Sequence, residues 1–340
     1  MSYDAILVLS FGGPEQREDV IPFLENVLRG KPVPRERLLE VAEHYYHFDG
    51  KSPLNDQCRA LMAALRTELD QHDIRLPIYW GNRNWAPYLT DTVLQMKRDG
   101  VTRVLTYVTS GFSCYSGCRQ YRENIAAALE HPEAAGLQID KLRVFFNHPD
   151  FIDVLAENVS AAFDRFDAAT REQAVVAFTA HSIPMSMATT SRYEEQLQES
   201  CRLVAEKLAL PADRWNLVYQ SRSGRPEDPW LEPDILDHLR DLKSRGISNV
   251  VISPIGFLSD HMEVLYDLDD EAARFCREHG INMYRAPTPG NHPGFVRMIR
   301  KLIAERLSGA PKECVGLYPP NHDVCPVDCC PAPSRPQRHP

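Results

Sequence analysis

Several features that would place the chain in other classes of protein are missing. No stretch of the 340 residues approaches 18 consecutive apolar residues, so no transmembrane helix is expected. Lys and Arg number 38 against 47 Asp and Glu, and the net charge of −9 disfavours a general nucleic-acid-binding surface. No nucleotide signature occurs, because residues 11–14 (FGGP) do not fit G-x-G-x-x-G and no P-loop is present.

The N-terminus also lacks the marks of a secretion signal. Asp4 stands where a basic region would be expected, and only five apolar residues follow it. We therefore expect a cytoplasmic protein. In that compartment the nine cysteines are interpreted as thiols or metal ligands before disulfides.

What is present is an alternation of short β-branched runs with long amphipathic segments. The predicted strands are 5–9, 77–80, 101–108, 142–146, 174–178, 216–220, 250–254 and 281–285. The predicted helices are 15–29, 54–72, 89–100, 121–130, 191–208, 233–245, 266–279 and 293–307. Buried strands joined by helices indicate an α/β fold with parallel sheets.

The same order of strands in each half predicts two similar doubly wound units. Their join is expected near residues 150–172, which gives domains at 1–155 and 170–309 and a Pro- and Cys-rich tail at 310–340. Ligands of open parallel sheets bind beyond the carboxyl ends of the strands. Those ends carry Gly, Ser, Arg and aromatic residues, so we expect the site in a cleft between the domains, with aromatic walls.

An acidic segment directly follows the predicted strand 250–254. Glu263, Asp267 and Glu271 are spaced four residues apart, which on an α-helix would align them in one stripe about 6 Å apart. Such a stripe suits a divalent cation or a path for protons. The alternative is an acidic first turn favoured by the helix dipole.

His181 ends another strand, in the turn 180–184 (AHSIP), where it could act as a base or a metal ligand. A structural histidine is the alternative. Arginine matches ligand carboxylates bidentately. The candidates for that role, each of which could equally be a solvated surface residue, are Arg29, Lys31, Arg83, Arg119, Arg222 and Arg225.

The cysteines fall into two sets. Cys58, Cys201 and Cys276 are scattered over predicted helices and are expected to be ordinary thiols. The tail instead carries Cys325, Cys329 and Cys330 within six residues, which suggests a metal or iron–sulfur site. A fourth ligand would come from Cys114 or Cys118 in the body of the chain. The alternative is a tail without a bound group, since C-x3-C-C is not a standard spacing.

Taken together, these motifs resemble the ferrochelatases, which insert Fe²⁺ into a porphyrin in haem synthesis. The resemblance runs from about residue 4 to 309. It rests on residues 9–14 (LSFGGP), 50–54 (GKSPL), 178–184 (FTAHSIP), 220–224 (QSRSG) with 229–231 (PWL), and 254–269, which begins PIGF. One departure is Asp49, where the family commonly has glycine. Residues 79–85 and 116–121 are similar to the actinobacterial type, which acts on coproporphyrin III.

The resemblance implies two Rossmann-like domains around a porphyrin cleft, with His181 and Glu263 as catalytic residues. It implies that His181, Glu263, Asp267 and Glu271 contact the metal. The residues implied to bind the porphyrin are Phe11, Arg29, Tyr45, Ser52, Phe112, Tyr121 and Trp230. It also implies a possible [2Fe-2S] cluster on Cys325, Cys329 and Cys330 with Cys118 or Cys114, and possible partner proteins of the haem pathway.

The sequence therefore predicts an enzyme that converts coproporphyrin III and ferrous iron to coproheme. An aromatic cleft would strain the macrocycle while His181 and Glu263 handle pyrrole protons and iron. The alternatives are a protoporphyrin IX ferrochelatase, a chelatase for another tetrapyrrole or metal, and a non-catalytic porphyrin or haem carrier. A nucleotide-dependent oxidoreductase is disfavoured by the missing glycine fingerprint.

Overall fold

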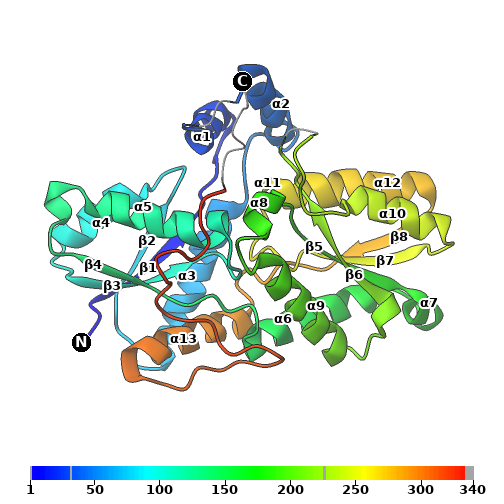
Figure 1. Ribbon diagram of the computed structural model, residues 1–340. Helices are drawn as coiled ribbons and strands as arrows, with labels where there is room; N and C mark the ends of the chain where they lie inside the picture. The colour runs from blue at the N-terminus through cyan, green and yellow to red at the C-terminus, as the bar shows by residue number, and fades with distance from the viewer. Residues whose placement is uncertain (1, 31–32, 225–226, 334–340) are drawn as a thin grey trace.

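The computed structural model describes residues 2–30, 33–224 and 227–333, arranged around two parallel four-stranded sheets (Figure 1). The first sheet has the order β2 (Ile78–Asn82), β1 (Ala5–Ser10), β3 (Arg103–Val108), β4 (Gln138–Lys141). The second has the order β6 (Trp215–Gln220), β5 (Val175–His181), β7 (Asn249–Ser253), β8 (Asn282–Arg285). The repeated order confirms the prediction of two similar doubly wound units.

Thirteen α-helices surround the sheets in the described ranges. Those of the first half are α1 (Val20–Val27), α2 (Arg35–Tyr46), α3 (Leu54–Gln71), α4 (Leu89–Arg98), α5 (Gln120–Leu129), α6 (Pro149–Phe163) and α7 (Ala168–Gln173). Those of the second half are α8 (Met185–Ala188), α9 (Tyr193–Lys207), α10 (Ile235–Ser244), α11 (Met262–Val264), α12 (Ala273–His279) and α13 (Pro293–Ser308). Two π-helical segments, η2 (Tyr115–Arg119) and η5 (Leu265–Ala272), and three 3-10 turns, η1 (Arg17–Asp19), η3 (Pro132–Ala134) and η4 (Ala212–Arg214), complete the set.

The alternation of strand side chains decides which helices cover which face. In β1, Ile6 and Val8 point into a large core shared with α3, α6, α9 and α13, whereas Leu7 and Leu9 point toward α4 and α5. In β5, Phe178 joins the shared core and Ala177 packs toward α10 and α12. Figure 1 shows these layers, with α4 and α5 above the first sheet and α10 and α12 above the second. Helices α1 and α2 stand apart, above the junction of the two units.

One expectation is corrected. Residues 142–146 were predicted to be a strand, but the fourth strand is the more polar β4, Gln138–Lys141. Leu142 and Phe146 are buried in the shared core as irregular chain. The join expected at residues 150–172 is largely helical, because α6 and α7 occupy it. Helix α6 packs against α9 and α13, and α13 in turn packs on α3 of the first unit.

The tail after α13 runs back over both units (Figure 1). The Asn147 amide nitrogen donates to the Tyr318 carbonyl at 2.8 Å, and the Leu317 backbone nitrogen donates to Glu199 Oε1 at 2.7 Å. These contacts bring the cysteine-rich segment to the start of α5. None of the helices in the described ranges is long and apolar enough to cross a membrane.

Candidate active site

His181 is the last residue of β5, the second strand of its sheet, and hydrogen bonds fix both its ring and its backbone. Its Nδ1 hydrogen-bonds the Ser182 carbonyl, and its own backbone carbonyl accepts a bond from the Tyr193 hydroxyl at 3.1 Å. A carbonyl can only accept, so Nδ1 carries a proton there and Nε2 is the atom turned outward.

Glu263 follows the neighbouring strand β7 and meets that outward nitrogen. Its Oε1 lies 3.5 Å from His181 Nε2. The turn before it is fixed by His261, whose Nδ1 accepts a hydrogen bond from the Glu263 backbone nitrogen at 3.1 Å. Because β5 and β7 pair in parallel, their carboxyl ends lie at the same edge of the sheet. The fold thus places an imidazole and a carboxylate side by side.

The two groups set each other's charge. Burial alone would lower the pKa of His181, but the Glu263 carboxylate and its hydrogen bond raise it to about 9. Burial would raise the pKa of Glu263, yet His181 lowers it to about 2. The side chains keep one third and nearly half of their surface exposed (33% and 47%), so the pair remains open to a ligand. Near neutral pH the site holds an imidazolium and a carboxylate.

Asp267 lies four residues after Glu263, and its pKa shifts in the opposite direction. Burial raises the pKa of Asp267 to about 7, a Ser221 hydrogen bond opposes the shift, and the charges of Glu263 and Glu271 add to it. The Gln220 amide nitrogen donates both to Asp267 Oδ2 at 3.2 Å and to the Glu263 carbonyl at 3.1 Å. Burial likewise raises the pKa of Glu271. The carboxyl groups of the stripe therefore differ in pKa, which is lowered for Glu263 and raised for Asp267 and Glu271.

Gln220 and Ser221 were not predicted to have a role, although both belong to a motif noted in the sequence. Ser221 adopts a left-handed backbone (φ 61°), which is costly for a residue other than glycine. That conformation lets its hydroxyl donate to Asp267. The only sign in the sequence that could have indicated this role is that Ser221 directly follows Gln220, the polar last residue of β6.

The backbone that carries the stripe differs from the expectation. Asp267 and Glu271 lie in a π-helix, η5, rather than in an α-helix. Such segments are rare and concentrate at functional sites. The aligned α-helical stripe with regular 6 Å steps was therefore the wrong local geometry.

The predicted porphyrin-binding residues fall into different environments. Phe11 and Tyr45 join a small aromatic cluster around Phe23, with ring centroids 6.2 and 5.8 Å from it. Tyr45 also feels the charge of Glu263, which, after burial, raises its pKa. Tyr45, on α2, therefore lies within electrostatic range of Glu263.

The other predicted binding residues are less exposed. Ser52, Phe112 and Tyr121 are buried, and Phe112 packs edge-on to Tyr193, which holds His181. Arg83 connects Tyr121 to Phe11, with its guanidinium 4.6 and 5.5 Å from the two ring centroids. Trp230 bridges to Pro184 in the turn that follows His181.

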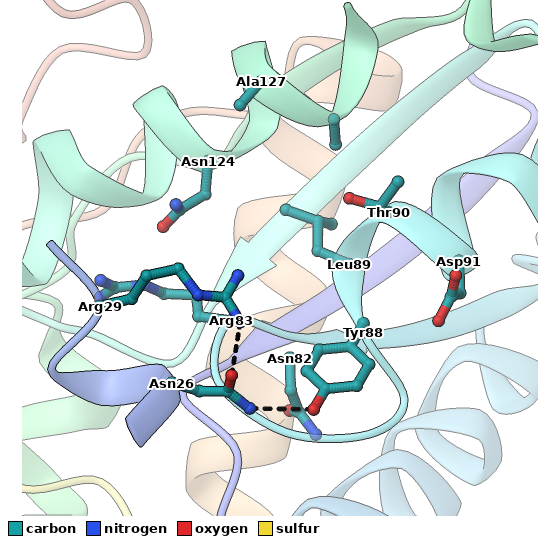
Figure 2. A pocket seen from close by; sticks show the side chains of 11 residues that line it. Asn26, Arg29, Asn82, Arg83, Tyr88, Leu89, Thr90, Asp91, Asn124 and Ala127 are labelled. Atoms are coloured by element: carbon teal, nitrogen blue, oxygen red, sulfur yellow. Dashed lines mark hydrogen bonds between the residues drawn. The ribbon is translucent and has the colours of Figure 1, made fainter. Parts of the chain in front are cut away.

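Arg29 opens onto a separate polar pocket of about 550 Å³ between α4 and α5 (Figure 2). Arg83 and Asn124 also line it, and the Arg29 guanidinium donates to the Asn26 side chain. The pocket can accept a carboxylate at the rim of the first unit. Two other basic candidates, Lys31 and Arg225, lie outside the described residues.

The tail cysteines converge on the start of α5. Cys118 and Cys325 share a side-chain hydrogen bond, which raises the pKa of Cys118 and lowers that of Cys325. The Sγ atoms of Cys329 and Cys330 are 3.6 Å apart. Cys114 instead accepts from the Gly117 backbone nitrogen at 3.2 Å. Cys58, Cys201 and Cys276 are buried elsewhere.

Comparison with known proteins identifies the family. The ferrochelatase family model matches residues 3–307. The chain is 58% identical to the ferrochelatase of Rhodopirellula baltica, over 96% of this chain and 93% of that protein. It is 49% identical to the coproporphyrin III ferrochelatase of Streptomyces coelicolor, over 97% of this chain and 94% of that one.

Solved structures show the same fold at low identity. The protein SirB from Bacillus subtilis, solved with Fe³⁺, superposes with a TM-score of 0.56 at 13% identity and covers 91% of this chain and 97% of its own. The sirohydrochlorin chelatase SirB of subspecies spizizenii, in complex with cobalt, gives 0.53 at 12%, over the same shares of the two chains. With a match over nearly its whole length, this chain belongs to the ferrochelatase family and is a metal chelatase that uses ferrous iron and a porphyrin.

Proposed function

We propose that this chain inserts Fe²⁺ into coproporphyrin III to give coproheme, with His181 and Glu263 as catalytic residues. The single observation that carries the proposal is the contact of 3.5 Å between His181 Nε2 and Glu263 Oε1 at the open edge of the second sheet. The choice of coproporphyrin is supported by the 49% identity to the Streptomyces coelicolor enzyme of that name.

Metallation must remove two pyrrole protons and strip water from the ion. With a pKa of about 9, His181 is protonated before iron arrives, so it cannot accept a pyrrole proton as it stands. An approaching cation repels the imidazolium proton, and Glu263 lies in contact to receive it. Asp267 has a pKa of about 7, so near neutral pH it is the carboxyl group that can accept this proton from Glu263.

The same groups are suited to hold the incoming ion. Imidazole and carboxylate are both ligands of Fe²⁺, so His181 and Glu263 would replace part of its water shell. Asp267 and Glu271 would supply further oxygen ligands along η5. Iron and protons would then move in opposite directions over one set of side chains.

The macrocycle would lie against Phe11 and Tyr45, with Trp230 beyond the His181 turn. Flat contact with aromatic rings provides binding energy that can hold the ring in a ruffled shape. Arg29 is placed to receive a peripheral carboxylate. Three of the predicted residues are buried, so they would shape the wall of the cleft without touching the macrocycle: Ser52, Phe112 and Tyr121.

The decisive experiment measures iron insertion with coproporphyrin III and with protoporphyrin IX side by side, under anaerobic conditions. We expect a higher kcat/KM for coproporphyrin III. A preference for protoporphyrin IX would contradict the substrate, and binding of either ring without metallation would contradict the activity.

We also propose that Cys118, Cys325, Cys329 and Cys330 hold a [2Fe-2S] cluster. The donor set fits, since four thiols converge and Cys325 is already stabilised as a thiolate by Cys118 and Arg122. When bound, such a cluster supplies a redox-active group that ties the tail to α5.

Anaerobically purified protein should therefore show visible absorption and about two equivalents each of iron and acid-labile sulfide, as the cluster formula requires. A colourless protein that is free of iron and fully active would contradict the cluster while leaving the chelatase proposal intact.

A further inference from the structure

The tail also brings a histidine into contact with the cysteine site. A ring nitrogen of His322, the Sγ of Cys325 and the Sγ of Cys329 all lie within 4.8 Å of one another. Neither composition nor motif singled out His322. The separation between Cys325 and Cys329 falls within the C-x2–4-C range of zinc ligands, and His322 precedes Cys325 by three positions.

The distances favour a mononuclear ion. Zinc bonds of about 2.0–2.3 Å place tetrahedral donors roughly 4 Å or less from one another, so three donors within 4.8 Å need only small rotations to converge. Cys118 lies next to Arg119 in η2, against which the tail loop is held, and its side chain interacts with that of Cys325, so it is the fourth donor from the body of the protein. The resulting set is three thiolates and one imidazole, a combination typical of closed structural zinc sites.

Two arginines hold the loop in place. Arg119 Nη1 donates to the Val327 carbonyl at 2.9 Å and to the Cys329 carbonyl at 3.3 Å. Arg122 Nη1 donates to the Pro326 carbonyl at 3.3 Å, and its charge lies beside Cys325. One divalent ion with three thiolates carries a net charge of −1, which the adjacent guanidinium balances.

We infer that Cys118, His322, Cys325 and Cys329 form a tetrahedral site for a single Zn²⁺ ion, distinct in its ligands from the cluster on Cys118, Cys325, Cys329 and Cys330. Binding releases the three thiol protons to solvent and transfers no electron. The two sets share three sulfurs, so the protein holds either the ion or the cluster, and the fourth ligand decides which.

The test titrates the full-length protein, freed of iron, with Co²⁺ and then displaces the cobalt with Zn²⁺. We expect one equivalent of cobalt with the visible bands of a tetrahedral thiolate site. His322→Ala should weaken binding by tenfold or more, on the order of the loss seen when metal-site partners are removed. Cys330→Ala and the surface control His72→Ala should bind cobalt like the wild type.

Assembly of the cluster from iron and sulfide gives the reciprocal measurement. Cys330→Ala should lose the cluster, whereas His322→Ala should keep it. Wild-type cobalt affinity in His322→Ala, or loss of cobalt in both Cys330→Ala and Cys330→Ser, overturns the zinc site. Failure to assemble a cluster in any variant, with the cobalt pattern intact, overturns the cluster alone. Circular dichroism of each variant checks that it is folded.

Discussion

His181 Nε2 and Glu263 Oε1 lie 3.5 Å apart although 82 residues separate them in the chain. The contact arises because β5 and β7 are hydrogen-bonded neighbours, so that His181 at the end of β5 and the segment that leads from β7 to Glu263 lie at one edge of the sheet. Tyr193 and His261 fix the two backbones from outside the pair. The geometry of the His181–Glu263 pair is thus a product of sheet topology and local capping.

Replacing His181 with alanine should abolish metallation, lowering kcat by on the order of 10²–10⁴-fold, the range for a lost general acid or base. Porphyrin affinity should change little, because the aromatic cluster of Phe11, Phe23 and Tyr45 is untouched. Stopped-flow absorbance gives the insertion rate and fluorescence quenching gives the porphyrin Kd. The exposed His72→Ala is the control, and normal turnover in His181→Ala would remove the proposed role.

The same pair should make stability depend on pH. The raised pKa of His181 gives stabilisation that is complete below about 6.5 and lost as the pH rises through about 9. The lowered pKa of Glu263 gives stabilisation present above about 4.5 and lost as the pH falls toward 2. Both side chains are exposed to water, so the effect should be about 1 kcal/mol or less. Calorimetry of Glu263→Gln should show a larger loss of Tm at pH 6 than at pH 9.5, and equal losses would contradict the pairing.

Asp267 should shape the pH dependence of the rate. Its pKa of about 7 means that the ionised form, which can take a proton or bind iron, gains population as the pH rises through 7. We expect kcat to rise around that pH in the wild type. Asp267→Asn should flatten the rise and lower kcat at pH 8 by on the order of tenfold. An unchanged pH profile would exclude Asp267 from the relay, and Asp269→Asn on the same helix is the matched control.

The hydrophobic pattern predicted the α/β architecture correctly. It gave the wrong secondary structure where a buried apolar segment is not a strand. Residues 142–146 are as apolar as a central strand, yet Phe145 and Phe146 pack against other aromatic side chains from irregular chain. The true edge strand β4 reads Gln-Ile-Asp-Lys and has little of the apolar signal of its neighbours. Hydrophobic periodicity reports burial, and it identifies a strand only when the two coincide.

The site could be predicted as far as each residue's place at a strand end. His181 and Glu263 stood out for that reason. Their distance could not be predicted, since it depends on the pairing of β5 with β7. The π-helical turn under Asp267 and the approach of His322 to Cys325 depend on contacts between distant segments, which no local pattern encodes.

The choice between the two internal cysteines can be tested directly. Cys118 shares a hydrogen bond with Cys325, whereas Cys114 is occupied by the Gly117 backbone nitrogen and the Ser116 hydroxyl. Cys118→Ser should therefore lose both the visible absorption and the labile sulfide. Cys114→Ser should retain them, with less than a twofold change. The opposite result would assign the fourth cluster ligand to Cys114.

The last prediction concerns the buried ion pair that ties α13 to the first unit. The Arg143 guanidinium donates to both oxygens of Glu305 at 2.8 Å, and the two side chains are 0% and 2% exposed. Arg143 also donates to the Glu313 carbonyl at the start of the tail.

Arg143→Met would leave the Glu305 carboxylate buried and unpaired, so we expect a loss of about 3–5 kcal/mol in the free energy of unfolding. Arg143→Met/Glu305→Met removes both charges and should recover much of that loss. Arg35→Met breaks the exposed pair with Glu25 and should cost less than about 1 kcal/mol. Urea denaturation measures all three variants. Equal effects at the buried and the exposed pair would mean that α13 is held by its apolar contacts with α3 and α6 alone.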